Sequence, residues 1–128
     1  MPVKYLSREW IDAYNAALAG DDAVHAALKG KSATLQMVIS DAPQGEVRYW
    51  LRIADGDAST GLGDAADSEV TISQSYETSA QVNKGELDGQ KAFMQGKVKI
   101  SGKMLKMMQL RSPLEKMQAG LNTIDTEY

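Results

Sequence analysis

The chain offers few residues for acid–base or nucleophilic chemistry. It contains one histidine and no cysteine. His25 lies near Asp21 and Asp22, and an imidazole beside a carboxylate is a pattern that general bases use. Aspartates at this spacing also cap helices, and we prefer the interpretation of His25 as a solvated or cap-adjacent residue. Because the sequence also has no HExxH, GxSxG or P-loop motif and no His/Asp/Glu cluster with metal-ligand spacing, we predict no enzyme activity, no metal and no cofactor.

The segment Gly61-Leu62-Gly63-Asp64-Ala65-Ala66 fits the pattern G-x-G-x-x-A of dinucleotide-binding proteins. That pattern has meaning only between a strand and a helix of a βαβ unit. Here it follows the turn dipeptide Asp55-Gly56 and precedes Val70-Thr71-Ile72, which has strand character. The segment is therefore predicted to be a loop.

The most informative segment of the chain is rich in methionine. Five of the seven methionines lie between Met94 and Met117. Met104, Met107 and Met108 are spaced by three and four, so that they share one face of a helix. Methionine adapts its shape and specifies packing poorly, and a face of this kind suits contact with a variable apolar ligand. A plain methionine-rich core is the alternative.

Positive charge is concentrated in the same region. Between Lys97 and Lys116 there are six cations and one anion, a local net charge of +5, whereas the whole chain has a net charge of −3. The acidic total disfavours nucleic-acid binding, because phosphate contacts need a basic face. The local cations have two interpretations. They form a solvated face, or they attract a lipid carboxylate, the phosphates of acyl-CoA or an anionic membrane surface. We predict no nucleic-acid partner. For the local cations we prefer the solvated face, and transient contact with an anionic membrane surface is the alternative.

Trp50 lies between Arg48 and Arg52 on the strand face opposite to Tyr49 and Leu51. One interpretation is a binding platform. The interpretation that we prefer is a surface tryptophan covered by arginine stems in a cation–π contact.

Length and composition predict one domain over residues 1–128. The chain is 43% hydrophobic and 24% charged, as in ordinary globular proteins, and it has no linker or low-complexity run. No window approaches the eighteen apolar residues of a spanning helix, and the amino terminus has no apolar signal region. The absence of cysteine fits a reducing compartment. We expect a soluble, unexported protein in the cytoplasm.

Hydrophobic periodicity predicts the elements that position these residues. Alternation with a period of two predicts strands at 34–39, 47–53, 58–62, 70–72 and 98–100. Spacings of three and four, with capping residues, predict helices at 7–20, 21–30, 76–84 and 88–95 and the methionine helix that ends at Leu110. In a last helix, Ser112 as N-cap, Pro113 at the first helical position and Glu115 three residues after the cap form a capping box. Because helices interrupt the strands instead of alternating with them, the fold class is α+β, with a mostly antiparallel sheet covered by helices.

The sequence between Ala66 and Leu110, about a third of the chain, resembles the sterol carrier protein 2 (SCP2) domain family. The resemblance rests on the Val-Thr-Ile strand after Ala66-Asp67, on Gly85-Glu86-Leu87, and on the contiguous string Lys91-Ala92-Phe93-Met94-Gln95-Gly96-Lys97-Val98-Lys99-Ile100-Ser101-Gly102 with the helix that follows it. It implies a five-stranded, largely antiparallel sheet and an apolar tunnel between sheet and helices. The tunnel would bind sterols, fatty acids or fatty acyl-CoA, and the family has no catalytic residues of its own.

The carboxyl terminus departs from one part of the family's pattern. Eukaryotic carriers end in a peroxisomal tripeptide of the Ser-Lys-Leu type, whereas this chain ends Thr126-Glu127-Tyr128. We expect a bacterial-type, stand-alone member in the cytoplasm.

The resemblance and the methionine stripe together predict a set of ligand-binding residues. Gln109 occupies a place where the family often has a glutamine that faces the ligand, and an exposed helical glutamine is the alternative. The predicted function is non-enzymatic binding or transfer of a fatty acid, fatty acyl-CoA or sterol-like lipid. The alternative is an interaction or homodimerisation module that keeps the fold and buries its apolar face against a partner. The predicted residues are Leu35, Met37, Ile39, Phe93, Met94, Met104, Met107, Met108, Gln109, Leu114, Met117 and Leu121.

Overall fold

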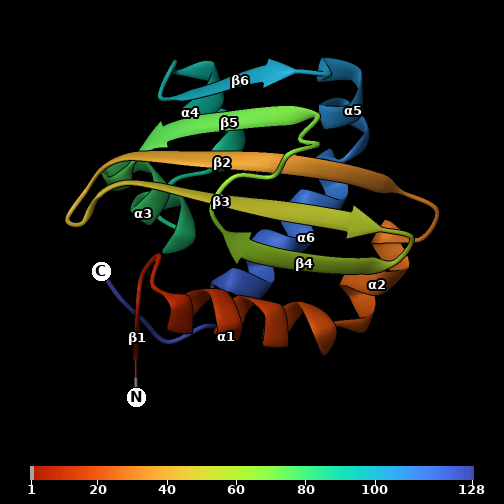
Figure 1. Ribbon diagram of the computed structural model, residues 1–128, viewed down its shortest axis with the longest axis horizontal. Helices are drawn as coiled ribbons and strands as arrows, with labels where there is room; N and C mark the ends of the chain where they lie inside the picture. The colour runs from red at the N-terminus through yellow and green to blue at the C-terminus, as the bar shows by residue number, and fades with distance from the viewer. Residues whose placement is uncertain (1) are drawn as a thin grey trace.

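A five-stranded sheet forms the centre of the molecule in the computed structural model, which describes residues 2–128 (Figure 1). Neighbouring strands are antiparallel except for the central pair, β2 and β5, which is parallel. A short parallel pair, β1 (Val3–Lys4) and β7 (Thr126–Glu127), joins the two ends of the chain. In spatial order the strands of the large sheet are β4 (Asp57–Leu62), β3 (Gly45–Ala54), β2 (Ser32–Ala42), β5 (Val70–Ser75) and β6 (Val98–Gly102).

Six helices form in the described part of the chain, and none of them is long and apolar enough to cross a membrane. Figure 1 shows helices grouped behind the sheet and α1 along the edge formed by β4. The predicted α+β class with a five-stranded, mostly antiparallel sheet is confirmed. The helices are α1 (Arg8–Ala19), α2 (Asp22–Leu28), α3 (Tyr76–Asn83), α4 (Gly89–Met94), α5 (Met104–Gln109) and α6 (Arg111–Leu121).

The first helix begins and ends as predicted. The Ser7 hydroxyl accepts a hydrogen bond from the backbone N–H of Trp10 at 3.2 Å, which is an N-cap, and Gly20 follows the last helical residue. The stripe of Trp10, Ile11, Tyr14 and Leu18 is buried against the sheet side of the molecule. The pattern of this segment is local, and for that reason the sequence predicts it well.

The hairpin of β2 and β3 presents its apolar residues to the helices. Leu35 pairs with Leu51, and Met37 pairs with Tyr49, so that these four side chains share one face of the sheet. Leu35, Tyr49 and Leu51 are buried there. This face is the floor on which the helical layer packs.

On the opposite face, the loop after β4 is held by a buried glutamine. The Gln36 amide nitrogen donates to the carbonyl oxygen of Gly63 at 3.1 Å, and its amide oxygen accepts from the N–H of Ala65 at 2.7 Å. The segment 61–66 is thus the end of a strand and a loop, and no helix follows it. The prediction of a loop is confirmed.

Trp50 also lies on this opposite face. The Arg52 guanidinium carbon is 5.2 Å from the centre of the Trp50 ring, which is a cation–π contact. Trp50 also covers Gly61 on the neighbouring strand, where an added Cβ would lie 2.5 Å from its ring. The preferred interpretation of Trp50 as an arginine-covered surface tryptophan agrees with these contacts.

The predicted capping box at the start of the last helix is wrong. α6 begins at Arg111 after Leu110, which makes no side-chain cap, and Ser112 and Pro113 lie within its first turn. The reason is burial: Leu110 is 2% exposed and anchors the one-residue junction between α5 and α6 in the core. Proline is tolerated in the first turn because its missing N–H has no intrahelical partner there.

Candidate ligand-binding cavity

A cavity of about 650 Å³ lies between the inner face of the sheet and the helices. Its floor comes from β2, β3, β5 and β6, and α6 supplies much of the roof. Most of the lining is apolar. Side chains of α4 and α5 form one end, whereas Tyr14 of α1 lies on the side of β3 and β4.

Nine of the twelve predicted residues line this cavity. They come from three separate parts of the chain, the β2 strand, the α4–α5 region and α6, which the fold brings together around one space. Whether they contact a ligand is a prediction taken up below. The nine are Leu35, Met37, Phe93, Met104, Met107, Met108, Leu114, Met117 and Leu121.

Ile39, Met94 and Gln109 lie outside this lining. Ile39 is on the expected face of β2 but is fully buried at 0% exposure and does not line the cavity. Met94 is the last residue of α4 and is 76% exposed. The spacing of apolar residues shows which face a side chain lies on, and it does not show how far along that face the cavity extends.

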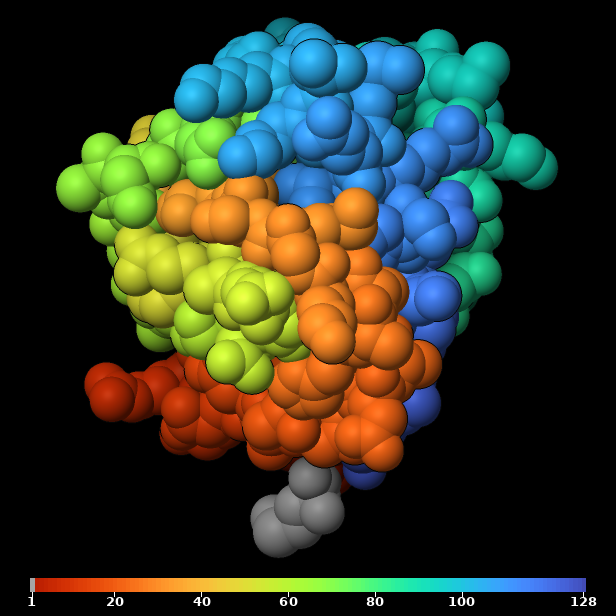
Figure 2. Space-filling view, turned by 90° about the vertical axis from the view of Figure 1, so that its right-hand side faces the viewer, coloured from red at the N-terminus to blue at the C-terminus, as the bar shows by residue number. Residues whose placement is uncertain are grey.

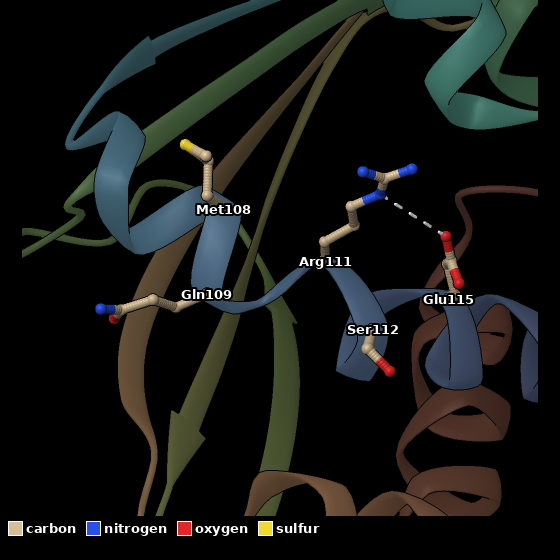
Figure 3. A pocket seen from close by; sticks show the side chains of 5 residues that line it. All are labelled: Met108, Gln109, Arg111, Ser112 and Glu115. Atoms are coloured by element: carbon tan, nitrogen blue, oxygen red, sulfur yellow. Dashed lines mark ion pairs between the residues drawn. The ribbon is translucent and has the colours of Figure 1, made fainter.

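Gln109 lines a separate, shallow hollow of about 450 Å³ together with Met108, Arg111, Ser112 and Glu115. Figure 3 shows its side chain directed away from Arg111 and Glu115. Gln109 is exposed at the end of α5. Its placement matches the alternative of an exposed helical glutamine.

Exposed apolar side chains surround the α4–α5 end of the cavity. Figure 2 shows the face on which α5 and α6 come to the surface beside α4. On these helices Phe93 and Met104 line the cavity while remaining 41% and 43% exposed, and Leu105 and Met108 are exposed further. Residues that both line the cavity and face solvent mark this end as the mouth.

An apolar cavity between a sheet and helices agrees with the family that the sequence matches. The sequence model of the SCP-2 sterol transfer family matches residues 14–115. The chain belongs to this family. The match extends well beyond the segment from Ala66 to Leu110 on which the resemblance was based.

Solved structures share the SCP-2 fold at low sequence identity. A crystal structure of sterol carrier protein 2 is 18% identical with a TM-score of 0.81, covering 94% of this chain and 99% of that chain. The sterol carrier protein domain 2 of Helicoverpa armigera is 21% identical with a TM-score of 0.68, covering 100% and 97%. Palmitated SCP2L2 from Aedes aegypti is 18% identical with a TM-score of 0.59, covering 94% and 99%. Among curated proteins, no significant sequence match was found.

Two lysines of this SCP-2 family member hold α5 against the sheet. The Glu69 carboxylate is 3.1 Å from the Lys106 ammonium and 3.5 Å from that of Lys103. The hydrogen bond from Lys106, together with the charges of both lysines, lowers the pKa of the Glu69 carboxyl below its ordinary value. Two of the six cations between Lys97 and Lys116 are therefore engaged in ion pairs with Glu69.

Arg111 joins α6 to α4. Its guanidinium donates to the amide oxygen of Gln90 at the start of α4. It also lies 3.9 Å from the carboxylate of Glu115 on its own helix (Figure 3). Lysines 97, 99 and 116 form no ion pair with any of residues 2–128, and their charges face solvent.

His25 lies away from the cavity and joins α2 to the β3–β4 turn. Its Nδ1 is 2.6 Å from the carbonyl oxygen of Gly56, and its Nε2 is 3.0 Å from that of Ala19. Two carbonyl acceptors require two N–H donors, so these contacts favour the protonated ring. The bonds to Ala19 and then Gly56 raise the pKa of His25 above its ordinary value. The side chain is 32% exposed, and the His25 N–H bonds to the carbonyl oxygen of the N-cap residue Asp21, which agrees with the interpretation of His25 as a solvated or cap-adjacent residue.

Several lining residues lie outside the set predicted from the sequence. Tyr14, Tyr49 and Leu51 line the cavity, and each lies on an apolar stripe that the periodicity had already identified. Extending the predicted wall to those stripes would have found them. Gln90 and Arg111 also line the cavity. Their contact joins α4 to α6, and no pattern of neighbouring residues in the sequence predicts it.

Proposed function

We propose that this SCP-2 family member binds a lipid in the 650 Å³ cavity and carries it without chemical change. The cavity is within the usual range of ligand pockets, about 300–1,000 Å³, and most of its lining is apolar. Both properties suit a fatty acid, a fatty acyl chain or a sterol-like molecule. The observation that carries the proposal is an apolar cavity with an exposed apolar mouth in a protein of this family.

The energetics favour occupation. Apolar surface removed from water contributes about 25 cal/mol for each Å². Side chains around an unfilled cavity lack packing partners on one side, and an apolar ligand supplies them. Methionines at 37, 104, 107, 108 and 117 add a lining that adapts to ligands of different shape.

The known relatives support this class of ligand. The solved structure from Aedes aegypti is described as palmitated, so at least one protein with this fold holds a fatty acyl chain. For the present chain, a long-chain fatty acid is the simplest probe. His25 is engaged by two backbone carbonyl oxygens away from the cavity.

The mouth suits brief docking on an anionic membrane. Leu105 and Met108 are about 70% exposed on α5, and the exposed Lys99 of β6 precedes them in the chain. Exposed apolar side chains beside cations are the combination that inserts into an anionic interface. We propose that lipid enters and leaves through this mouth while it contacts a membrane.

Titration with a fluorescent fatty acid tests the proposal, with two variants that place the same charge in different surroundings. Met107→Lys puts an ammonium group into the cavity wall, whereas Met94→Lys puts it on an exposed residue outside the lining. We expect saturable micromolar binding by the parent and by Met94→Lys, and at least tenfold weaker binding by Met107→Lys. No saturable binding, or equal binding by both variants, would contradict the proposal.

A second candidate is an interaction module in which a partner chain covers the exposed apolar patch of α4 and α5. The patch itself is the observation that favours it, because large exposed apolar areas mark interaction sites. Light scattering and native mass spectrometry separate the two functions. A stable dimer without lipid would favour the interaction module, and a monomer that retains lipid would favour the carrier.

A further inference from the structure

Two tyrosines stand at the end of the cavity opposite to the mouth. Tyr14 of α1 and Tyr49 of β3 both line the cavity and are only 4% and 6% exposed. Trp10 packs against both, with ring centroids 5.5 Å from Tyr14 and 5.6 Å from Tyr49. α1 runs along β4 at one edge of the sheet (Figure 1), whereas the α4–α5 mouth lies beside β5 and β6. The two tyrosines, on α1 and β3, therefore lie at the inner end of the cavity.

Neither tyrosine hydroxyl has a hydrogen-bond partner among residues 2–128. Tyr5, in the same aromatic cluster, differs because its hydroxyl bonds to Ser79. Within the same residues, Nε1 of Trp10 is the only fully enclosed side-chain nitrogen or oxygen without a partner. The hydroxyls of Tyr14 and Tyr49 are therefore not enclosed by protein atoms. Since both residues are otherwise buried and line the cavity, their hydroxyls open into it.

The surroundings define the chemistry of this inner end. Burial raises the pKa of both phenols far above the ordinary value of 10, so both are neutral O–H groups at physiological pH. A neutral phenol donates one hydrogen bond and also accepts. The charged residues that line the cavity, Asp88, Arg111 and Glu115, come from the N-terminal ends of α4 and α6 instead. The inner end thus offers hydrogen bonds without a compensating cation, which suits an uncharged polar group better than a carboxylate.

We propose that Tyr14 and Tyr49 form a polar subsite for the hydroxyl or ketone oxygen of a lipid whose oxygen-bearing end enters the cavity first. A purely hydrocarbon tail leaves both hydroxyls without a partner when it displaces water, and that loss is unfavourable. A lipid with an oxygen at its inner end replaces the lost hydrogen bonds. This inference rests on the proposed function, because it names the ligand class of the same cavity.

Competition between fatty acids that differ by one oxygen tests the subsite. The probes are hexadecanoic acid, 16-hydroxyhexadecanoic acid and 15-oxohexadecanoic acid, each displacing a fluorescent fatty acid from the parent and from the Tyr14→Phe/Tyr49→Phe double variant. The hydroxylated and the keto acid distinguish the two kinds of oxygen. Tyr76→Phe is the matched control, because Tyr76 packs against Tyr5 in the same cluster but does not line the cavity.

We expect the double variant to shift the ratio of dissociation constants toward hexadecanoic acid by about three- to tenfold for at least one of the oxygenated acids, the effect of one or two hydrogen bonds. The Tyr76→Phe ratio stays at the parental value. Removing unpartnered hydroxyls keeps the ring packing, so the variant is expected to fold, and the single variant Tyr49→Phe reports a smaller shift in the same direction.

An unchanged ratio in the double variant would overturn the subsite, and it would mean that water in the cavity satisfies both hydroxyls. A failure of all three acids to displace the probe, or of the probe to bind, would overturn the proposed function together with the subsite. If the acids displace the probe and bind every variant equally well, the proposed function stands and only the subsite is refuted.

Discussion

Asn15 and Thr60 exchange two hydrogen bonds between α1 and the edge strand β4. The Asn15 amide nitrogen donates to the Thr60 carbonyl oxygen at 2.9 Å, and the Thr60 N–H donates to the Asn15 amide oxygen at 2.8 Å. The side chain therefore pairs with the strand as a further strand would, and it covers part of an exposed sheet edge. It also fixes α1 at the position that brings its neighbour Tyr14 to the cavity.

Replacing Asn15 tests the contribution of this pair of hydrogen bonds to stability. Asn15→Ala leaves both backbone groups of Thr60, a residue that is 4% exposed, without a partner. We expect the free energy of unfolding to fall by about 1–3 kcal/mol, the usual effect of unsatisfied buried groups. Urea unfolding measures the change, and Gln44→Ala in an exposed turn is the control. Equal stability of the two variants would show that this pair of hydrogen bonds contributes nothing.

The doubly bonded His25 predicts a specific pH dependence. Because its pKa is raised in the folded state above the ordinary value of 6.5, folding binds a proton. The stabilisation is fully present below pH 6.5 and is lost as the pH rises through the folded pKa. The free energy of unfolding of the parent, measured in urea between pH 5.5 and about 8.5, should fall relative to that of His25→Gln. If the free energy of unfolding changes with pH in the same way in both proteins, a protonated His25 does not stabilise the fold.

Glu69 is predicted to order α5 rather than to stabilise the whole protein. Glu69→Gln weakens the attachment of Lys103 and Lys106, which are partly exposed pairs worth about 1 kcal/mol or less. Amide hydrogen exchange should accelerate in residues 104–109 and remain unchanged in β2 and β3. Glu115→Gln, which removes a single exposed contact with Arg111, is the control. Uniform acceleration throughout the chain would argue against a local role.

Two glycines around β6 differ in how strictly they are required. Both have positive φ, +104° at Gly102 and +76° at Gly96, but a Cβ at Gly102 would also lie 2.3 Å from the Glu69 carbonyl oxygen, whereas nothing lies near Gly96. Gly96→Ala should cost only the backbone strain of about 1–2 kcal/mol. Gly102→Ala should lower the free energy of unfolding clearly further, as thermal or urea unfolding will measure. Equal losses would mean that the Glu69 backbone moves away without penalty.

Local patterns and tertiary contacts explain what the sequence predicts and what it does not. Ser7 and the stripe after it define α1 within one segment, so the helix is predicted with its cap. The start of α6 is missed because burial of Leu110, a contact with distant residues, outweighs the capping signal of Ser112. The stripes that carry Tyr14 and Tyr49 are predictable, but the free hydroxyls become apparent only once all their neighbours are known.

Methionine methyl NMR tests lipid binding in the cavity most directly. With methyl-¹³C methionine, hexadecanoic acid should shift the signals of the five lining methionines in a saturable manner, and leave that of Met94, outside the lining, in place. The five are Met37, Met104, Met107, Met108 and Met117. Unchanged spectra, or shifts confined to the exposed Met94 and Met108, would contradict a lipid in this cavity.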